Sequence, residues 1–114
     1  MLSNNICWPV LLHPDGMDEL IYVDNMIELQ NEFNSSTIRC VPEDRLIDSQ
    51  GRLFNLQCDV VSGQLNIISM QQTLNLESFS ILVRRHFSAM NQCCISKINL
   101  VSFDQGIQLV KSTD

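Results

Sequence analysis

The sequence predicts an α+β domain of two layers, in which a mostly antiparallel sheet of about five strands is covered by two to three helices. Two strand–turn–strand signals predict the antiparallel pairing, one around Pro14-Asp15-Gly16 and one around Ser49-Gln50-Gly51. An apolar stripe of helical period over residues 75–91 predicts the main covering helix. Because the chain has 114 residues and 45% of them are hydrophobic, we expect residues 1–114 to form a single domain.

The first hairpin is expected to pair strands 6–12 and 19–23. Residues 6–12 form a mainly apolar run, and the turn that follows contains proline and glycine, which suit a tight reversal of the chain. Pro9 lies inside this run and has no backbone N–H to donate. We therefore expect either an edge position for the first strand or a break in its pairing at Pro9.

A short helix is predicted over residues 25–34. Asn25 and Glu28 have the spacing of a capping box, in which the first side chain accepts a hydrogen bond from the backbone N–H three residues later. Three apolar residues then recur at helical spacing, namely Met26, Leu29 and Phe33. The polar residues after position 34 end the pattern.

Three further strands, 45–48, 52–61 and 64–70, are predicted to form a meander. Gly51 lies where a short hairpin loop requires a positive φ angle. In the second of these strands apolar and polar residues alternate, so that one face is apolar and consists of Phe54, Leu56, Cys58 and Val60. The meander should therefore supply the middle of the sheet.

The longest helix is predicted over residues 75–91, after a polar connector at 71–73. Asn75 suits the N-cap, and Leu74 and Phe79 have the spacing of a hydrophobic staple. One broad face of this helix is apolar and consists of Leu76, Phe79, Leu82, Val83, Phe87 and Met90. Ile81 lies outside that face, so we expect its side chain to be exposed.

The last two elements are a β-rich run over 93–101, a candidate sixth strand, and a helix over 102–111. Ser102 and Gln105 have capping-box spacing at the start of this helix. We expect the last helix to pack at an end of the sheet, and the two earlier helices to cover one of its faces together.

Charge and composition argue against several classes of protein. The chain has 13 acidic and 7 basic side chains, for a net charge of −6, and nucleic-acid binding generally requires basic surface. No apolar run reaches the roughly 20 residues of a membrane-spanning helix. The first residues also lack the basic start of a secretory signal. We therefore expect a cytoplasmic protein that binds neither nucleic acid nor membranes.

Familiar catalytic and cofactor-binding patterns are absent from the sequence. There is no phosphate-binding glycine-rich loop, no nucleophile elbow and no metalloprotease motif. The five cysteines are irregularly spaced without a C-x-x-C pair, so no zinc or redox motif is indicated. We therefore expect no cofactor.

His86 is the residue that most suggests chemistry, because it lies within the apolar face of the 75–91 helix. Together with a thiolate from Cys93 or Cys94, it could ligate a metal ion or activate a nucleophile. The structural interpretation is that His86 borders the core and forms hydrogen bonds with the backbone. We favour this interpretation, because the spacing from His86 to the cysteines matches no zinc-binding pattern.

A second group of candidates is basic. Arg84 and Arg85, with Lys97, could form a small patch that binds an anion or an acidic partner. Ile81 is the apolar residue on the same side of the helix. Glu77 partly neutralises this face, so we prefer the explanation that it is an ordinary solvated helix surface.

Several segments together point to a family. They are Trp8-Pro9 with Leu11-Leu12, residues 18–23, residues 46–52, the helix from Leu76 to His86, and Cys93-Cys94-Ile95. In this order they resemble a small family of uncharacterised proteins from marine gammaproteobacteria, which forms a domain of unknown function. The resemblance implies a bacterial, cytoplasmic α+β protein, and it carries over no catalytic or binding residue.

The function expected from these observations is that of a non-enzymatic protein-interaction or accessory module. Such a module could bind a protein partner or form a homodimer, through an exposed strand edge or the Ile81 side of the long helix. The alternative is a small metal- or thiol-dependent enzyme or sensor that uses His86 with Cys93 or Cys94. A third possibility is anion binding at Arg84, Arg85 and Lys97.

Overall fold

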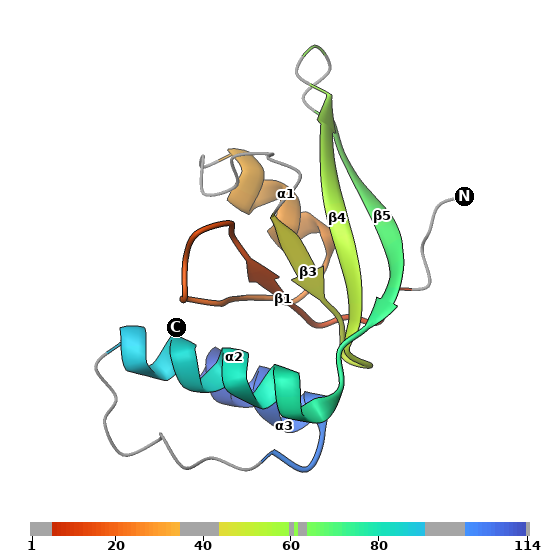
Figure 1. The fold of residues 1–114 in the computed structure, drawn as a ribbon. Coiled ribbons are helices and arrows are strands. Elements are labelled where there is room, and N and C mark those ends of the chain that lie inside the picture. Colours follow the sequence, from red (N-terminus) through yellow and green to blue (C-terminus); the bar gives the residue numbers. More distant parts are fainter. Residues whose placement is uncertain (1–5, 35–43, 60, 62–63, 91–99, 114) are drawn as a thin grey trace.

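Five strands form one antiparallel sheet in the computed structural model of the chain, which describes residues 6–34, 44–59, 61, 64–90 and 100–113. The strands are β1 (Val10–His13), β2 (Ile21–Val23), β3 (Arg45–Ile47), β4 (Arg52–Asp59) and β5 (Gln64–Thr73). Their order across the sheet is β2-β1-β3-β4-β5 (Figure 1). With the helices α1 (Met26–Asn34), α2 (Leu76–Ala89) and α3 (Phe103–Lys111), they confirm the predicted α+β class.

Strand β1 has apolar side chains on both faces. Val10 lies opposite Val23, and Leu12 lies opposite Leu46. These four residues belong to one apolar cluster, the α1-side core, which also contains Leu29, Phe54, Leu56 and Leu65. Leu11 points to the other face, because successive side chains alternate along a strand. The uninterrupted apolar run of the sequence therefore reflects a strand that is buried on both faces.

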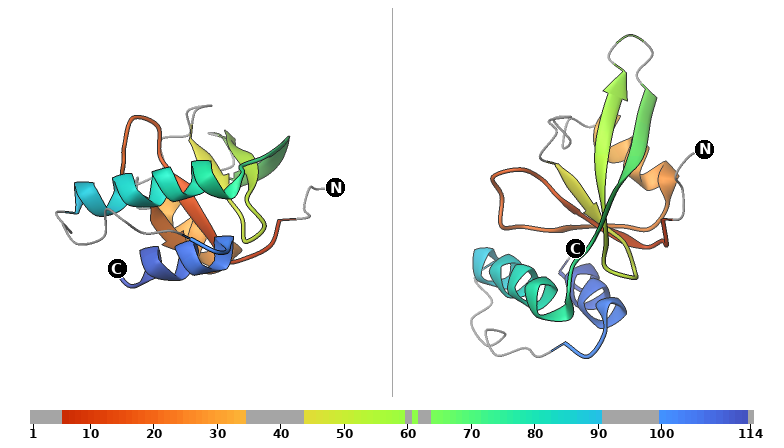
Figure 2. Two further views of the ribbon diagram at one scale, coloured as in Figure 1. Left: turned by 60° about the horizontal axis from the view of Figure 1, so that its bottom comes forward. Right: turned by 45° about the vertical axis from the view of Figure 1, so that its right-hand side comes forward.

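The helices divide between the two faces of the sheet. Helix α1 packs on one face through Leu29. Helices α2 and α3 lie side by side over the other face (Figures 1 and 2). Their α2-side core consists of Leu11, Leu20, Ile47, Phe79, Val83, Phe87, Leu100, Ile107 and Val110. The prediction that helices 25–34 and 75–91 cover the same face is therefore wrong, because periodicity shows that a helix has an apolar side but not which sheet face that side meets.

The turn between β3 and β4 is organised by the buried carboxylate of Asp48, which is 0% exposed. Its oxygens accept four hydrogen bonds, of 2.9 to 3.1 Å, from the backbone N–H groups of Cys7, Gln50 and Arg52 and from Nε of Arg52. Gly51 has a φ of +79°, as predicted, and its N–H donates to the Asp48 carbonyl. This carboxylate therefore fixes both the hairpin loop and the segment that leads into β1.

The predicted helix caps are present. The side chains of Asn25, Asn75 and Ser102 accept hydrogen bonds from the backbone N–H three residues later, at 2.9, 2.7 and 3.1 Å. The Gln105 side chain accepts from the N–H of Val101, the residue before the N-cap, and not from the Ser102 N–H as in a regular capping box. A side chain at Gly106 would collide with the ring of Phe79, so this glycine allows α3 to approach α2 closely.

Some boundaries differ from the prediction. Strand β1 starts at Val10 instead of residue 6, directly after the proline that cannot donate to the ladder. Strand β5 continues through residues 71–73, which were expected to be a connector, and it carries a bulge at the register shift, where Gln71 has a φ of +56°. Residues 91–99, which hold most of the candidate sixth strand, lie outside the described residues.

Candidate functional site

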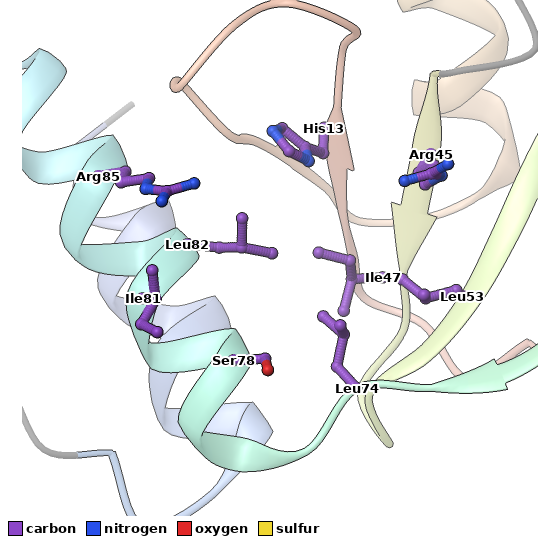
Figure 3. A pocket seen from close by; sticks show the side chains of 9 residues that line it. All are labelled: His13, Arg45, Ile47, Leu53, Leu74, Ser78, Ile81, Leu82 and Arg85. Carbon is purple, nitrogen blue, oxygen red and sulfur yellow. The ribbon is translucent and has the colours of Figure 1, made fainter.

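A pocket of about 300 Å³ lies between α2 and the sheet face that α2 covers. Strands β1, β3 and β4 supply one wall, the first half of α2 and its central turns supply the other, and the β5–α2 connection closes one end (Figure 3). The lining residues are His13, Arg45, Ile47, Leu53, Leu74, Ser78, Ile81, Leu82 and Arg85. The pocket therefore lies next to the α2-side core and opens to solvent.

The lining separates into an apolar part and a basic part. Ile47, Leu74 and Leu82 point toward one another across the cavity, with Ile81 and Leu53 beside them (Figure 3). At the other end lie His13, Arg45 and Arg85, and the guanidinium of Arg85 extends over the cavity (Figure 3). None of the described residues that line the pocket carries a carboxylate. The site can thus contact an apolar group and an anionic group at the same time.

Strand pairing brings His13 and Arg45 together. They lie directly opposite each other in the β1–β3 ladder, and both point to the face that carries α2. The His13 ring is held by a 2.9 Å hydrogen bond between Nε2 and the carbonyl oxygen of Met17. Because a carbonyl can only accept, Nε2 carries the proton of this bond. The ring is therefore fixed at the rim of the pocket.

Of the predicted site residues, some line the pocket and others do not. Ile81 and Arg85 both line the pocket, and Ile81 is 39% exposed, as expected for an apolar residue outside the buried stripe. Arg84 is half-buried and does not line the pocket. Cys93, Cys94 and Lys97 lie outside the described residues. The basic residues that line the pocket with Arg85 are therefore His13 of β1 and Arg45 of β3.

The sequence did not predict that His13 and Arg45 belong to this site. One local signal was present for Arg45: side chains alternate along a strand, so Arg45 lies on the same face as Ile47. The pairing of β1 with β3 joins segments more than 30 residues apart, so the approach of His13 to Arg45 required the strand order.

His86 is buried, with 2% of its surface exposed, and both of its ring nitrogens form hydrogen bonds. Nδ1 accepts from the backbone N–H of Leu20 at 2.8 Å, and Nε2 lies 3.0 Å from Oγ1 of Thr113. An N–H group can only donate, so Nδ1 is unprotonated and the neutral ring donates from Nε2. Thr113 donates in turn to the carbonyl of Val110.

These hydrogen bonds agree with the structural interpretation of His86. The ring joins α2 to the loop before β2 and to the end of α3, and it leaves no nitrogen open to a metal ion in this arrangement. Within the part of the chain that the structure describes, no group of three His, Cys, Asp or Glu side chains could hold a metal ion. His86 thus has a structural role among the described residues, which do not include Cys93 and Cys94, the possible thiol partners of the alternative.

The outer edge of β5 is a second candidate surface. Strand β5 pairs with β4 on one side, and no strand of the described residues pairs with its other side. Residues Gln64–Ser69 are in continuous register with β4, before the bulge. They contain neither a charged residue nor a proline. Before the bulge, no described strand pairs with this edge, and no charged residue or proline is present there to prevent strand addition.

The family follows from a comparison with family models. Residues 8–110 match the DUF4144 model, which is described as a protein structure with unknown function. The chain belongs to the DUF4144 family. This result confirms the resemblance to a family of unknown function that several sequence segments indicated.

A solved structure has the same fold as this DUF4144 chain. It is described as the NMR structure of the protein from Shewanella Amazonensis, and it matches with a TM-score of 0.73 and 23% sequence identity. The match covers 100% of this chain and 95% of the other. No curated protein matches the DUF4144 chain. Among its described helices, none is long and apolar enough to cross a membrane.

Proposed function

We propose that this DUF4144 domain is a non-enzymatic interaction module that forms a homodimer by antiparallel pairing of β5 with β5 of a second copy. The observation that carries the proposal is the uncharged edge at Gln64–Ser69, with which no other strand than β4 pairs among the described residues. An edge strand offers a row of backbone donors and acceptors to any chain that can lie beside it. Natural proteins commonly block such edges with charge, proline or a covering segment.

The opposite edge of the sheet, strand β2, is shorter and is contacted by helices. Strand β2 has three residues, against ten in β5. It contacts both α1 and α3. Two of its residues also belong to the α1-side core, because Val23 is buried in it and Ile21 packs against it. Strand addition is therefore favoured at β5.

Charge supports a second copy as the partner. The chain as a whole carries a net charge of −6, which opposes contact between most pairs of surfaces. The β4–β5 hairpin, residues 52–73, contains only Arg52 and Asp59 as charged residues, so its net charge is zero. Two copies can therefore meet along β5 with little like-charge repulsion. A two-fold axis between antiparallel strands also gives a closed dimer, the commonest oligomer.

Ile68→Lys is expected to disrupt this dimer. Ile68 is 42% exposed on β5, opposite Asn55, and lies on the face away from the α1-side core. A lysine there places like charges on both copies of the shared edge, so we expect the dimer dissociation constant to increase by about tenfold or more. Light scattering coupled to size exclusion, over a concentration series, measures this change.

Ile27→Lys is the matched control. Ile27 is 73% exposed on α1, so this variant loses an exposed isoleucine and gains one positive charge away from the edge. It should dimerise as the wild type does. A wild-type chain that stays monomeric up to millimolar concentration would contradict the proposal. Equal weakening of the dimer by both variants would contradict it as well.

A further inference from the structure

The pocket between α2 and the sheet has a lining that suits one chemical class of ligand. We propose that it binds a small amphipathic carboxylate, with the carboxylate between Arg45 and Arg85 and a short apolar chain against Ile47, Leu74 and Leu82. This site is separate from the β5 edge and goes beyond the proposed dimer. Charge, geometry and size each support it.

The basic end of the pocket is unusual in this chain. Acidic side chains outnumber basic ones by 13 to 7, yet the described lining of the pocket contains two arginines and a histidine and no acidic residue. Arg52 forms an ion pair with Asp48. Neither Arg45 nor Arg85 forms an ion pair with another described residue. Two guanidinium groups are therefore available to an anion in a protein that otherwise repels anions.

The two arginines approach the cavity from different elements. Arg45 comes from β3 and Arg85 from α2, on opposite sides of the pocket mouth (Figure 3). A guanidinium presents two parallel N–H groups that match the two oxygens of a carboxylate. A carboxylate between them can therefore accept hydrogen bonds from both sides, with His13 at the rim as a further polar neighbour.

The apolar part of the pocket argues against a simple inorganic anion. Five of the nine lining residues are leucine or isoleucine, and Leu74 and Leu82 are half-buried against the core. Covering these side chains with a ligand removes apolar surface from water, which contributes roughly 25 cal/mol per Å². Phosphate alone would leave these apolar side chains exposed to water.

Size restricts the apolar chain to a short one. The cavity volume of about 300 Å³ lies at the lower end of the range for small-molecule pockets. A saturated chain of medium length is compatible with such a space, whereas a large polycyclic ligand is not. Octanoate has both required parts and is a suitable probe.

The test is a titration of octanoate, below its micelle concentration, into the full chain, followed by NMR chemical shifts and by calorimetry. We expect shifts at residues that line the pocket. Arg45→Met and Arg85→Met remove the charge but retain a long apolar side chain. Each should weaken octanoate binding by about tenfold or more, because each removes a charge-assisted hydrogen bond.

Arg84→Met is the matched control, because Arg84 is the neighbour of Arg85 on α2 and does not line the pocket. It should leave the affinity for octanoate within about twofold of the wild type. Arg45 and Arg85 are both exposed, so these two variants should fold. Arg84 is half-buried, and thermal unfolding verifies that all three variants are folded.

Two further ligands test the apolar contacts and the anionic contacts one at a time. Octanol tests the apolar chain without the charge, and inorganic phosphate tests an anion without the chain. Both should bind at least about tenfold more weakly than octanoate. The proposal is overturned if octanoate causes no shifts in the pocket, if octanol or phosphate binds as tightly, or if Arg84→Met weakens binding as much as Arg85→Met does.

Discussion

Asp48→Ala is expected to lower the free energy of unfolding by roughly 3 kcal/mol or more, because it removes a buried carboxylate that accepts four hydrogen bonds. The substitution leaves the backbone N–H groups of Cys7, Gln50 and Arg52 without their acceptor. It also removes the 3.0 Å contact between the carboxylate and Nε of Arg52. Urea denaturation followed by circular dichroism measures the change.

Asp48→Asn separates hydrogen bonding from packing. Asparagine has almost the same volume, but its amide NH₂ would face the Cys7 N–H and Arg52 Nε, which are both donors. We therefore expect this variant to be strongly destabilised too. Asp18→Asn, at an exposed loop position, is the control and should change stability by less than about 0.5 kcal/mol. A stable Asp48→Asn protein would show that the carboxylate does not organise the turn.

His86→Ala should lower the free energy of unfolding by about 2–4 kcal/mol, since it combines a cavity with an unsatisfied donor. The buried ring is lost from the junction of α2, α3 and the loop before β2. The N–H of Leu20 loses its acceptor in a buried position. Equilibrium denaturation of the variant and the wild type measures the difference.

His86→Asn tests the role of Nδ1. The asparagine carbonyl oxygen occupies nearly the position of Nδ1 and can accept from the Leu20 N–H, so this variant should be more stable than His86→Ala. Ser88→Ala, on the exposed side of the same helix, should be close to neutral. Equal stability of His86→Ala and the wild type would remove the structural role assigned to this histidine.

Local features of the fold were predictable because they depend on neighbouring residues. The left-handed Gly51 and the caps at Asn75 and Ser102 all follow from residues a few positions apart. The alternation of β4 also predicted which of its side chains enter the core, such as Phe54 and Leu56. Each of these signals has a geometric cause within one element.

Long-range features were not predictable in this way. The pairing of β1 with β3 and the opposite placement of α1 and α2 depend on which apolar surfaces meet after the elements form. Similarly, the helix period identified Ile81 as an outlier, and Arg85 was noted as a basic residue. Their neighbours His13 and Arg45 come from strands whose order the sequence does not display.

The position of the sheet between two apolar clusters has a thermodynamic consequence. Side chains such as Leu29 and Val83 belong to different clusters, separated by the backbone of the strands. Substitutions at residues that share no contacts usually change stability additively, whereas substitutions at neighbours are coupled. The interior of this small domain therefore behaves as two nearly independent sets of positions, and sequence change within one set is constrained mainly by the members of that set.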